Sequence, residues 1–269
     1  MPEPGLESPL HAALATGQDA VLSMVEAAIA AGRLTLAFQP VVRAGAGHQV
    51  AFQEALLRIL DPSGRTIPAA EFIDAAESRD TGRRLDCIAL QSGLDTLRHW
   101  PGLRLSVNMS ARSIGYAPWT ATLDRALAAD PTLAERLIFE ITESSAISMP
   151  DVVLAFMAGM RSRGVSFALD DFGAGFTAFR HLRDFCFDIV KIDGQFVRGI
   201  DTNPDNEVLV AALVSVARHF DMFTVAERVE TPAEAAVLAA LGVDCLQGYL
   251  FGMPAAEPFA AADTARISA

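Results

Sequence analysis

The chain has 269 residues, with 21 Lys and Arg against 33 Asp and Glu and a formal net charge of −12. Hydrophobic residues make up 51% of it, so the chain can bury a core and does not have the composition of a disordered protein. The negative charge argues against a surface that binds a nucleic-acid polymer by neutralising its phosphates.

Predicted strands and helices alternate along the chain. Strands are expected at short apolar segments, at residues 35–42, 49–57, 103–109, 137–141, 165–169, 188–192, 223–226 and 243–246. Helices are expected at residues 18–31, 69–78, 83–98, 117–129, 148–163, 205–220 and 232–241, with a further short helix over 176–185. Short apolar strands of this kind are typical of a sheet that is buried on both faces.

Two of these helices begin with capping signals. Thr231, Pro232 and Glu234 combine an N-cap threonine, a proline at the first helical position and a glutamate three residues after the cap. Ser148 and Asp151 have the same three-residue spacing, which predicts a capping box at the start of the helix over 148–163.

The order of elements indicates the fold class. Eight strands separated by helices predict an α/β protein with a TIM-like (β/α)8 barrel. The alternative is an open, doubly wound parallel sheet. No change in composition marks a domain boundary, so we expect one barrel domain over residues 18–260 between tails at residues 1–17 and 261–269.

Neither a membrane span nor a secretion signal is expected. The chain has no run of about 18 apolar residues, and residues 1–9 contain two glutamates but no basic residue. Cys87, Cys186 and Cys245 are far apart and favour free thiols in a reducing compartment. These features predict a cytoplasmic protein that does not bind a membrane.

Polar residues lie at the ends of seven of the eight predicted strands. In a barrel the C-terminal ends of parallel strands converge on one mouth, where barrel enzymes carry their chemistry. The residues expected at that mouth are Glu54, Arg58, Asn108, Glu140, Glu143, Asp170, Asp171, Lys191, Asp193, Glu227, Glu230 and Gln247.

The candidate ligands in this set are all oxygen donors. Without His or Cys, such ligands suit Mg²⁺, Mn²⁺ or Ca²⁺ rather than zinc. So many carboxylates at one mouth would repel one another unless cations neutralise them or several are protonated. Two ions about 3.5–4 Å apart are a common means of hydrolysing a phosphodiester, so the set favours that reaction.

Several of these residues also have a purely structural interpretation. Glu54 could form a salt bridge with Arg58, and the adjacent aspartates 170 and 171 could cap the helix that follows them. Residues 173–178 also match the loose G-x-G-x-x-A pattern of a dinucleotide-binding loop. The two aspartates directly precede that segment and would repel a pyrophosphate, so a loop beside a metal site is the favoured interpretation.

The same segments resemble the EAL domain family of cyclic di-GMP phosphodiesterases. Its signature occurs here at Glu54-Ala55-Leu56, followed by Leu57-Arg58. Further motifs follow in the family's order at residues 38–40, 106–110, 140–143, 170–173, 191–193, 226–231 and 247–249, so the resemblance covers roughly residues 34–254.

The resemblance implies a barrel whose first strand runs antiparallel to the others. The metal ligands it implies are Glu54, Asn108, Glu140, Asp170, Asp171 and Glu227, and the catalytic residues are Lys191, Glu227 and Asp171. The substrate-binding residues it implies are Gln39, Arg58, Asp193 and Gln247, and the loop after the fifth strand would be supported by Glu143 and Glu230.

The implied reaction is hydrolysis of cyclic di-GMP to the linear dinucleotide pGpG, by water that two Mg²⁺ or Mn²⁺ ions activate, with Ca²⁺ inhibitory. The alternative is a catalytically weak or inactive domain that acts as a cyclic di-GMP receptor. The resemblance also implies a role in bacterial signalling and biofilm control. It further implies a homodimer packed near the loop after the fifth strand, where Phe172, Phe176 and Phe179 could form an exposed patch.

Two stretches depart from the family pattern. In the loop after the fifth strand, Ala174, Phe176 and Ala178 replace three residues that carry hydroxyl groups in the family. Arg228 stands where the family has glycine. If this position needs a positive φ, arginine there is expected to strain the backbone beside Glu227.

Overall fold

The computed structural model describes residues 9–45, 47–173 and 183–259. Its sheet consists of β1 (Leu34–Arg43), β2 (Val50–Leu60), β3 (Thr66–Pro68), β4 (Leu105–Asn108), β5 (Leu137–Thr142), β6 (Ser166–Phe172), β7 (Ile189–Ile192), β8 (Phe223–Ala226) and β9 (Cys245–Gln247). The strand order is β1-β9-β8-β7-β6-β5-β4-β2-β3, and a further pairing of β1 with β2 closes eight of these strands into a barrel.

The direction of β1 sets this barrel apart from an all-parallel one. β1 is antiparallel to both of its neighbours, β2 and β9, whereas the strands from β2 through β9 in the barrel run parallel to one another. The TIM-like barrel with an antiparallel first strand is therefore confirmed, and the open sheet is excluded because the sheet closes on itself. The short strand β3 was not predicted and pairs with the end of β2.

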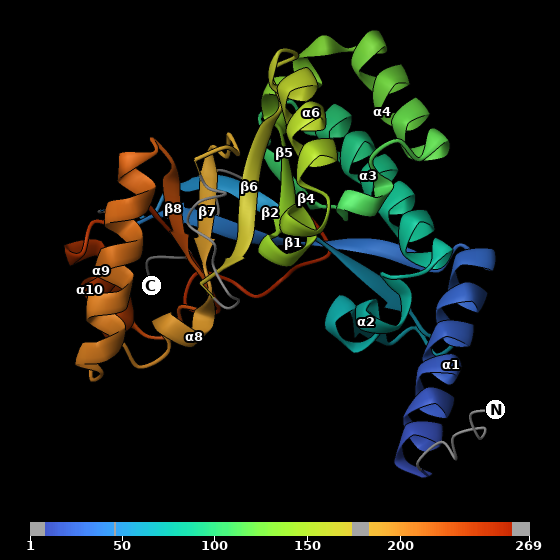
Figure 1. Ribbon diagram of the computed structural model, residues 1–269, viewed down its shortest axis with the longest axis horizontal. Helices are drawn as coiled ribbons and strands as arrows, with labels where there is room; N and C mark the ends of the chain where they lie inside the picture. The colour runs from blue at the N-terminus through green and yellow to red at the C-terminus, as the bar shows by residue number, and fades with distance from the viewer. Residues whose placement is uncertain (1–8, 46, 174–182, 260–269) are drawn as a thin grey trace, which may run out of the picture.

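The α-helices cover the outside of the barrel. They are α1 (Pro9–Ala30), α2 (Ile73–Ala76), α3 (Asp80–His99), α4 (Ala117–Ala129), α5 (Glu143–Ser148), α6 (Pro150–Arg161), α8 (Gly194–Val197), α9 (Pro204–His219) and α10 (Pro232–Ala240). Short 3₁₀ helices occur at Ala69–Glu71, Ala111–Ser113 and Pro131–Arg136. Helices α3, α4 and α6 lie on one flank of the sheet and α9 and α10 on the other, while α1 extends along one side next to α2 (Figure 1).

Several helices begin at other residues than predicted, including α2 at Ile73 instead of residue 69 and α3 at Asp80 instead of residue 83. Helix α1 begins at Pro9 instead of residue 18. The helix predicted over 148–163 is split into α5 and α6, so the capping box of Ser148 and Asp151 is wrong. The cause is Pro150, which disfavours helical geometry at the residue before it, and Met149 accordingly has φ −141° and ψ 56°.

The capping box at Thr231 is confirmed. The Thr231 side chain accepts a hydrogen bond from Glu234 N, and the Glu234 carboxylate accepts one from Thr231 N at 3.0 Å. Most of the helix predicted over 176–185 lies outside the described residues.

The core has three parts. The largest lies between the strands and the surrounding helices, and a second packs α1 and α2 against the end of β2. The third lies inside the barrel, where Val41, Phe52, Ile138, Ala168, Ile189 and Val225 pack together. This interior cluster fills one end of the barrel and forms a floor below the polar residues of the other end.

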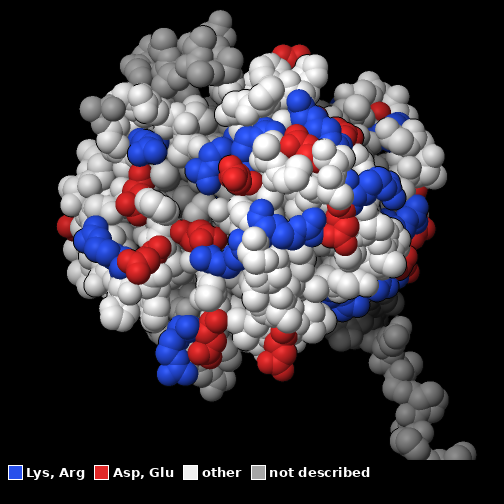
Figure 2. All heavy atoms as spheres, turned by 90° about the horizontal axis from the view of Figure 1, so that it is seen from above, with Lys and Arg blue, Asp and Glu red and all other residues white. Residues whose placement is uncertain are grey.

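The exposed phenylalanine patch predicted for a dimer is not supported at Phe172, which is fully buried in the core. Phe176 and Phe179 lie outside the described residues. Within the described part of the chain, no helix has the length and apolar character needed to cross a membrane. The face seen from above in Figure 2 intersperses Lys and Arg with Asp and Glu instead of gathering one sign of charge.

Candidate active site

The polar end of the barrel interior is built by strand alternation. Side chains two residues apart point to the same face of a strand, and five charged residues of the site each lie two positions after a residue of the interior floor. On β2 Glu54 follows Phe52, on β5 Glu140 follows Ile138, and on β6 Asp170 follows Ala168. Lys191 and Glu227 follow Ile189 and Val225 in the same way. The strands thus direct these side chains into the barrel, above the floor.

Lys191 lies at the centre of this group. Its Nζ donates hydrogen bonds to Glu140 Oε2 at 2.7 Å and to Glu54 Oε2 at 3.2 Å. It also lies 3.1 Å from Asp170 Oδ1 and 2.8 Å from Glu227 Oε1. Four carboxylates therefore share one ammonium group, whose side chain is only 1% exposed.

Glu54 connects this centre to the neighbouring strands. Its carboxylate accepts hydrogen bonds from Asn108 Nδ2 at 2.8 Å and from Gln247 Nε2 at 2.6 Å. Gln247 Nε2 also lies 3.3 Å from Oε1 of Gln39, the residue that pairs with Glu54 across β1 and β2. Glu54 is thus held by Lys191, Asn108 and Gln247, and a salt bridge with Arg58 is absent from the described residues.

The carboxylates around the shared ammonium differ in the direction of their pKa shifts. Burial opposes the ionised form of Glu54, but Lys191 and the hydrogen bonds from Gln247 and Asn108 outweigh it and lower its pKa. Burial and the negative charge of Glu54 raise the pKa of Glu140 well above its usual range. Burial, opposed by Lys191, raises the pKa of Glu227 to about 8. One ammonium cannot offset several buried negative charges, so protons remain on part of the group when no other cation is bound.

The pKa of the central lysine moves in the opposite direction. Burial alone would lower the pKa of Lys191, but the four surrounding carboxylates raise it well above its usual value. The ammonium group therefore stays charged at neutral pH.

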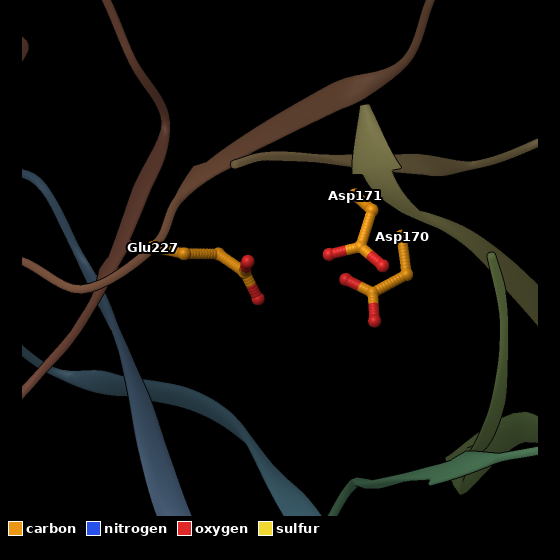
Figure 3. A group of neighbouring side chains, drawn as sticks. All are labelled: Asp170, Asp171 and Glu227. Atoms are coloured by element: carbon orange, nitrogen blue, oxygen red, sulfur yellow. The ribbon is translucent and has the colours of Figure 1, made fainter. Parts of the chain in front are cut away.

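This arrangement fits a divalent cation. The ligands are carboxylate and amide oxygens, which hard cations prefer. Asp170, Asp171 and Glu227 can each present an oxygen such that these atoms lie within 4.8 Å of one another. Figure 3 shows the Glu227 carboxylate directed toward those of the two aspartates. Among the described residues, the buried Oε1 of Glu140 has no hydrogen-bond partner, which leaves an oxygen available to a cation.

The site opens into a cavity of 810 Å³. Its lining includes Gln39, Arg58, Asn108, Glu140, Asp171, Glu230, Gln247 and Tyr249. Arg58 donates from Nη1 to Leu57 O at 2.9 Å, and burial lowers its pKa. The cavity therefore combines an acidic interior with side chains able to contact a larger polar ligand at its rim.

The remaining predicted residues lie close to this centre. Asp193 is buried and caps α8, because its Oδ1 accepts a hydrogen bond from Gln195 N at 2.8 Å. Glu143 is buried at the start of α5, directly after β5, and Glu230 lies on the cavity wall. The lining of the described cavity does not include Asp193 or Glu143.

Two positions in the site have a positive φ without being glycine. Asp171 has φ 56° and Arg228 has φ 55°. The condition stated for residue 228, a positive φ, is thus met. Such a conformation costs roughly 1–2 kcal/mol for a residue with a Cβ, so the surrounding structure must impose it.

One acidic residue of the cavity was not found from the sequence. Asp86, on α3, accepts hydrogen bonds from Ser113 Oγ at 2.6 Å and from Ser110 N at 3.0 Å. Burial raises its pKa to about 6 despite these two donors. Asp86 is within a helical segment, far in sequence from the strand end that it contacts, so no strand-end pattern could have identified it.

The profile of a family described as EAL domain matches residues 22–254. The chain is 33% identical over 231 residues to the "Cyclic di-GMP phosphodiesterase PdeB" of Shewanella oneidensis, which covers 84% of this chain and 27% of PdeB. The curated relatives that it matches are thus much longer than this chain, which spans less than half of PdeB and of PdeN from Escherichia coli.

The chain is also similar to solved structures of EAL domains. The PaMucR phosphodiesterase in a c-di-GMP complex has a TM-score of 0.76 and 29% identity, covering 87% of this chain and 97% of that one. The FimX EAL domain from Pseudomonas aeruginosa bound to c-di-GMP has a TM-score of 0.77 and 27% identity, covering 87% of this chain and 96% of that one.

Proposed function

The chain belongs to the EAL domain family, and we propose that it hydrolyses cyclic di-GMP to the linear dinucleotide pGpG with the help of divalent metal ions. Relatives that share about a third of its residues are named as phosphodiesterases of this nucleotide. The observation that carries the proposal is the convergence of Glu54, Glu140, Asp170 and Glu227 on one interior point. That point lies in a cavity whose volume is in the range of small-molecule sites.

The residues proposed to hold the ions are Glu54, Asn108, Glu140, Asp170, Asp171 and Glu227. Mg²⁺ or Mn²⁺ bound by them would supply positive charge and activate water for attack on a phosphodiester. Ca²⁺ is proposed to bind at the same place and to inhibit.

Lys191 and Glu227 have separate roles in the proposal. The ammonium of Lys191 stays charged, so it can stabilise the negative charge that develops on phosphate oxygens. Glu227 is proposed to hold the second ion or its water, since its carboxylate lies close to those of Asp170 and Asp171. Gln39, Arg58, Asp193 and Gln247 are proposed to contact the nucleotide, and Glu143 and Glu230 to support the loop beside the ions.

A chromatographic assay tests the proposal. Purified protein is incubated with cyclic di-GMP in Mg²⁺, in Mn²⁺, in Ca²⁺ and in excess chelator, and the nucleotides are then separated. We expect pGpG to accumulate with Mg²⁺ or Mn²⁺ and no turnover with chelator. Full activity in chelator would reject the metal-dependent reaction.

A receptor that binds cyclic di-GMP without cleaving it is the second candidate. The observation that favours it is that Lys191 already contacts four carboxylates, so the cluster can persist without a metal ion. Binding of cyclic di-GMP by calorimetry, with no product in any metal, would support the receptor. A homodimer and a cytoplasmic location stay predictions.

A further inference from the structure

Arg228 occupies a backbone conformation that arginine itself does not favour. The non-glycine residues with positive φ in the described chain are His48, Asp171, Asp221 and Arg228. Histidine and aspartate are among the side chains enriched in this region, whereas arginine is not. The position therefore needs an explanation from its surroundings.

The neighbouring hydrogen bonds fix this conformation. On one side, Glu227 N donates to Ile192 O of β7 at 3.1 Å. On the other side, Val229 N donates to Gln247 O of β9 at 3.0 Å, and Leu250 N donates to Val229 O. Residue 228 must connect two anchored residues, so the tertiary structure imposes the positive φ on whichever side chain is present.

The arginine side chain is held against a glycine. A Cβ built on Gly194 would lie 2.8 Å from Arg228 Cβ and 2.7 Å from its Cγ, and would overlap its Cδ. The aliphatic part of Arg228 thus packs on the backbone of Gly194, which directly follows Asp193. This contact restrains the side chain beside the site even though the residue is exposed.

The charge of Arg228 acts on the acidic cluster. Burial and the negative charges of Asp170 and Asp193 raise the pKa of Asp171, and the positive charges of Lys191 and Arg228 oppose that rise. Arg228 also lines the same cavity as Asp171 and Glu227. Arg228 therefore lies on the cavity side of the molecule, where its charge acts on a carboxylate that could hold a metal ion.

Of the cations that line the cavity, Arg228 is the one without a hydrogen bond or ion pair of its side chain among the described residues. Lys191 is surrounded by four carboxylates, and Arg58 donates to the carbonyl of Leu57. Across the described ranges, no carboxylate lies within 4.0 Å of the Arg228 guanidinium, and its nitrogens make no side-chain hydrogen bond. An exposed, restrained and unpaired guanidinium beside an acidic cluster can bind an anion that approaches this cluster.

We propose that Arg228 binds the terminal phosphate that hydrolysis creates and thereby retains the linear product. This inference rests on the proposed function and names one further binding residue for it. A terminal phosphate carries up to one more negative charge than a phosphodiester, and a guanidinium can bind it with two parallel hydrogen bonds. Arg228 should therefore contribute more to the binding of the product than to that of the cyclic substrate.

The test compares two linear dinucleotides that differ only in the terminal phosphate. pGpG and GpG are titrated calorimetrically into the full chain in Ca²⁺, and chromatography confirms that the nucleotides stay intact. For the wild-type chain we expect a preference for pGpG over GpG. In Arg228→Asn this preference should fall about tenfold, the factor that the loss of one charge-assisted contact gives, while the Kd of GpG changes little.

Three further variants separate charge from backbone conformation. Arg228→Gly also lacks the cation but accepts the positive φ freely, so it should lose the same preference as Arg228→Asn. Arg228→Lys should retain part of it. Arg43 is exposed at the opposite end of the barrel, where it pairs with Cys245 at the start of β9, and Arg43→Asn should keep the full preference.

The outcomes are distinct. An unchanged preference in Arg228→Asn and Arg228→Gly, with a wild-type chain that cleaves cyclic di-GMP, overturns the role of Arg228 alone. A preference that survives in Arg228→Gly but not in Arg228→Asn also overturns it, because conformation and not charge would then be the cause. A wild-type chain that binds none of these nucleotides overturns the proposed function as well.

In steady-state assays, inhibition by pGpG should weaken about tenfold in Arg228→Asn.

Discussion

The inside of the barrel has two layers that come from the same strands and have opposite chemistry. The floor consists of Val41, Phe52, Ile138, Ala168, Ile189 and Val225. The layer above it consists of Gln39, Glu54, Glu140, Asp170, Lys191 and Glu227, each two residues from a member of the floor. One step of the strand alternation therefore separates an apolar core from an ionic site.

The two layers are held together by different forces. The floor is stabilised by removing apolar surface from water and by close packing. The polar layer depends on one ammonium that contacts four carboxylates, and burial of charge opposes its formation. The floor therefore raises the free energy of unfolding. The polar layer lowers it, because charged groups are held in the barrel interior.

The largest effect is expected when a carboxylate, typical of the polar layer, is introduced into the floor. Ala168→Asp would bury a carboxylate with no cation beside it, and Ala168 lies directly beside Glu140 in the sheet register. We expect the free energy of unfolding to fall by about 5 kcal/mol or more, measured by urea denaturation. Ala158→Asp, on the exposed face of α6, is the matched control and should cost less than about 1 kcal/mol. Similar losses in both variants would contradict the distinction between the layers.

The second-largest effect is a loss of activity at nearly unchanged stability. Asp170→Asn keeps the shape of a side chain in the polar layer but removes the charge proposed to hold a metal ion. Turnover of cyclic di-GMP should fall at least about 1,000-fold, equivalent to about 4 kcal/mol in the activation barrier. Its circular dichroism spectrum should be unchanged and its Tm should shift by no more than a few degrees. The exposed Asp201→Asn serves as the control, and near wild-type turnover in Asp170→Asn would remove Asp170 from the proposed ligands.

The third prediction tests whether Lys191 stands in for a metal ion. Lys191→Met leaves four carboxylates without their shared cation. In chelator the free energy of unfolding should fall by about 3 kcal/mol, as measured by denaturation. Added Mg²⁺ should restore much of this loss by neutralising the same carboxylates. An equal loss with and without Mg²⁺ would show that the lysine acts by packing alone.

The smallest effect is a slope of stability against pH. The pKa of Glu227 rises from 4.5 to about 8 in the folded chain, so the folded state binds more protons than the unfolded state between these values. The contribution of Glu227 to the stability of the metal-free protein should therefore be largest below about pH 4.5 and should decline as the pH rises to about 8. Because Glu227 is partly exposed, we expect the decline to be about 2 kcal/mol.

The variant Glu227→Gln isolates this contribution. Its unfolding free energy should lack the part of the decline that Glu227 causes, in thermal or urea unfolding measured at several pH values. Mg²⁺ should also flatten the wild-type profile, because a bound cation favours the ionised carboxylate. A difference in unfolding free energy between the wild type and Glu227→Gln that stays constant from pH 5 to pH 8 in chelator would contradict the raised pKa.

The two layers also show what could be predicted from the sequence. The alternation in Phe52 to Glu54 and in Ile189 to Lys191 is local, since a strand has a fixed period of two. A buried polar residue in an apolar segment therefore indicates a site without knowledge of its partners. The N-cap at Thr231 was predictable for the same reason, because capping involves residues only three positions apart. The cap at Ser148 was not, because Pro150 overrides the spacing of Ser148 and Asp151.

Other features depend on residues that are distant in the chain. Asp86 reaches the site because α3 packs beside the segment that follows β4, and nothing in its own helix distinguishes it. The sequence could not show whether Phe172 is buried in the core or exposed in a patch, because a phenylalanine shortly after a predicted strand is compatible with either place. The positive φ of Arg228 is set by hydrogen bonds to β7 and β9.

The sequence by itself determined the eight strands of the barrel, their inward polar residues and the membership of the chain in the EAL domain family, because these follow from short-range periodicity and from motifs of fixed spacing. The tertiary structure alone decided that one ammonium is shared by four carboxylates, and therefore which pKa values rise and which fall. Electrostatic energies depend on distance and burial, and both are set only when strands from the whole length of the chain close into one barrel.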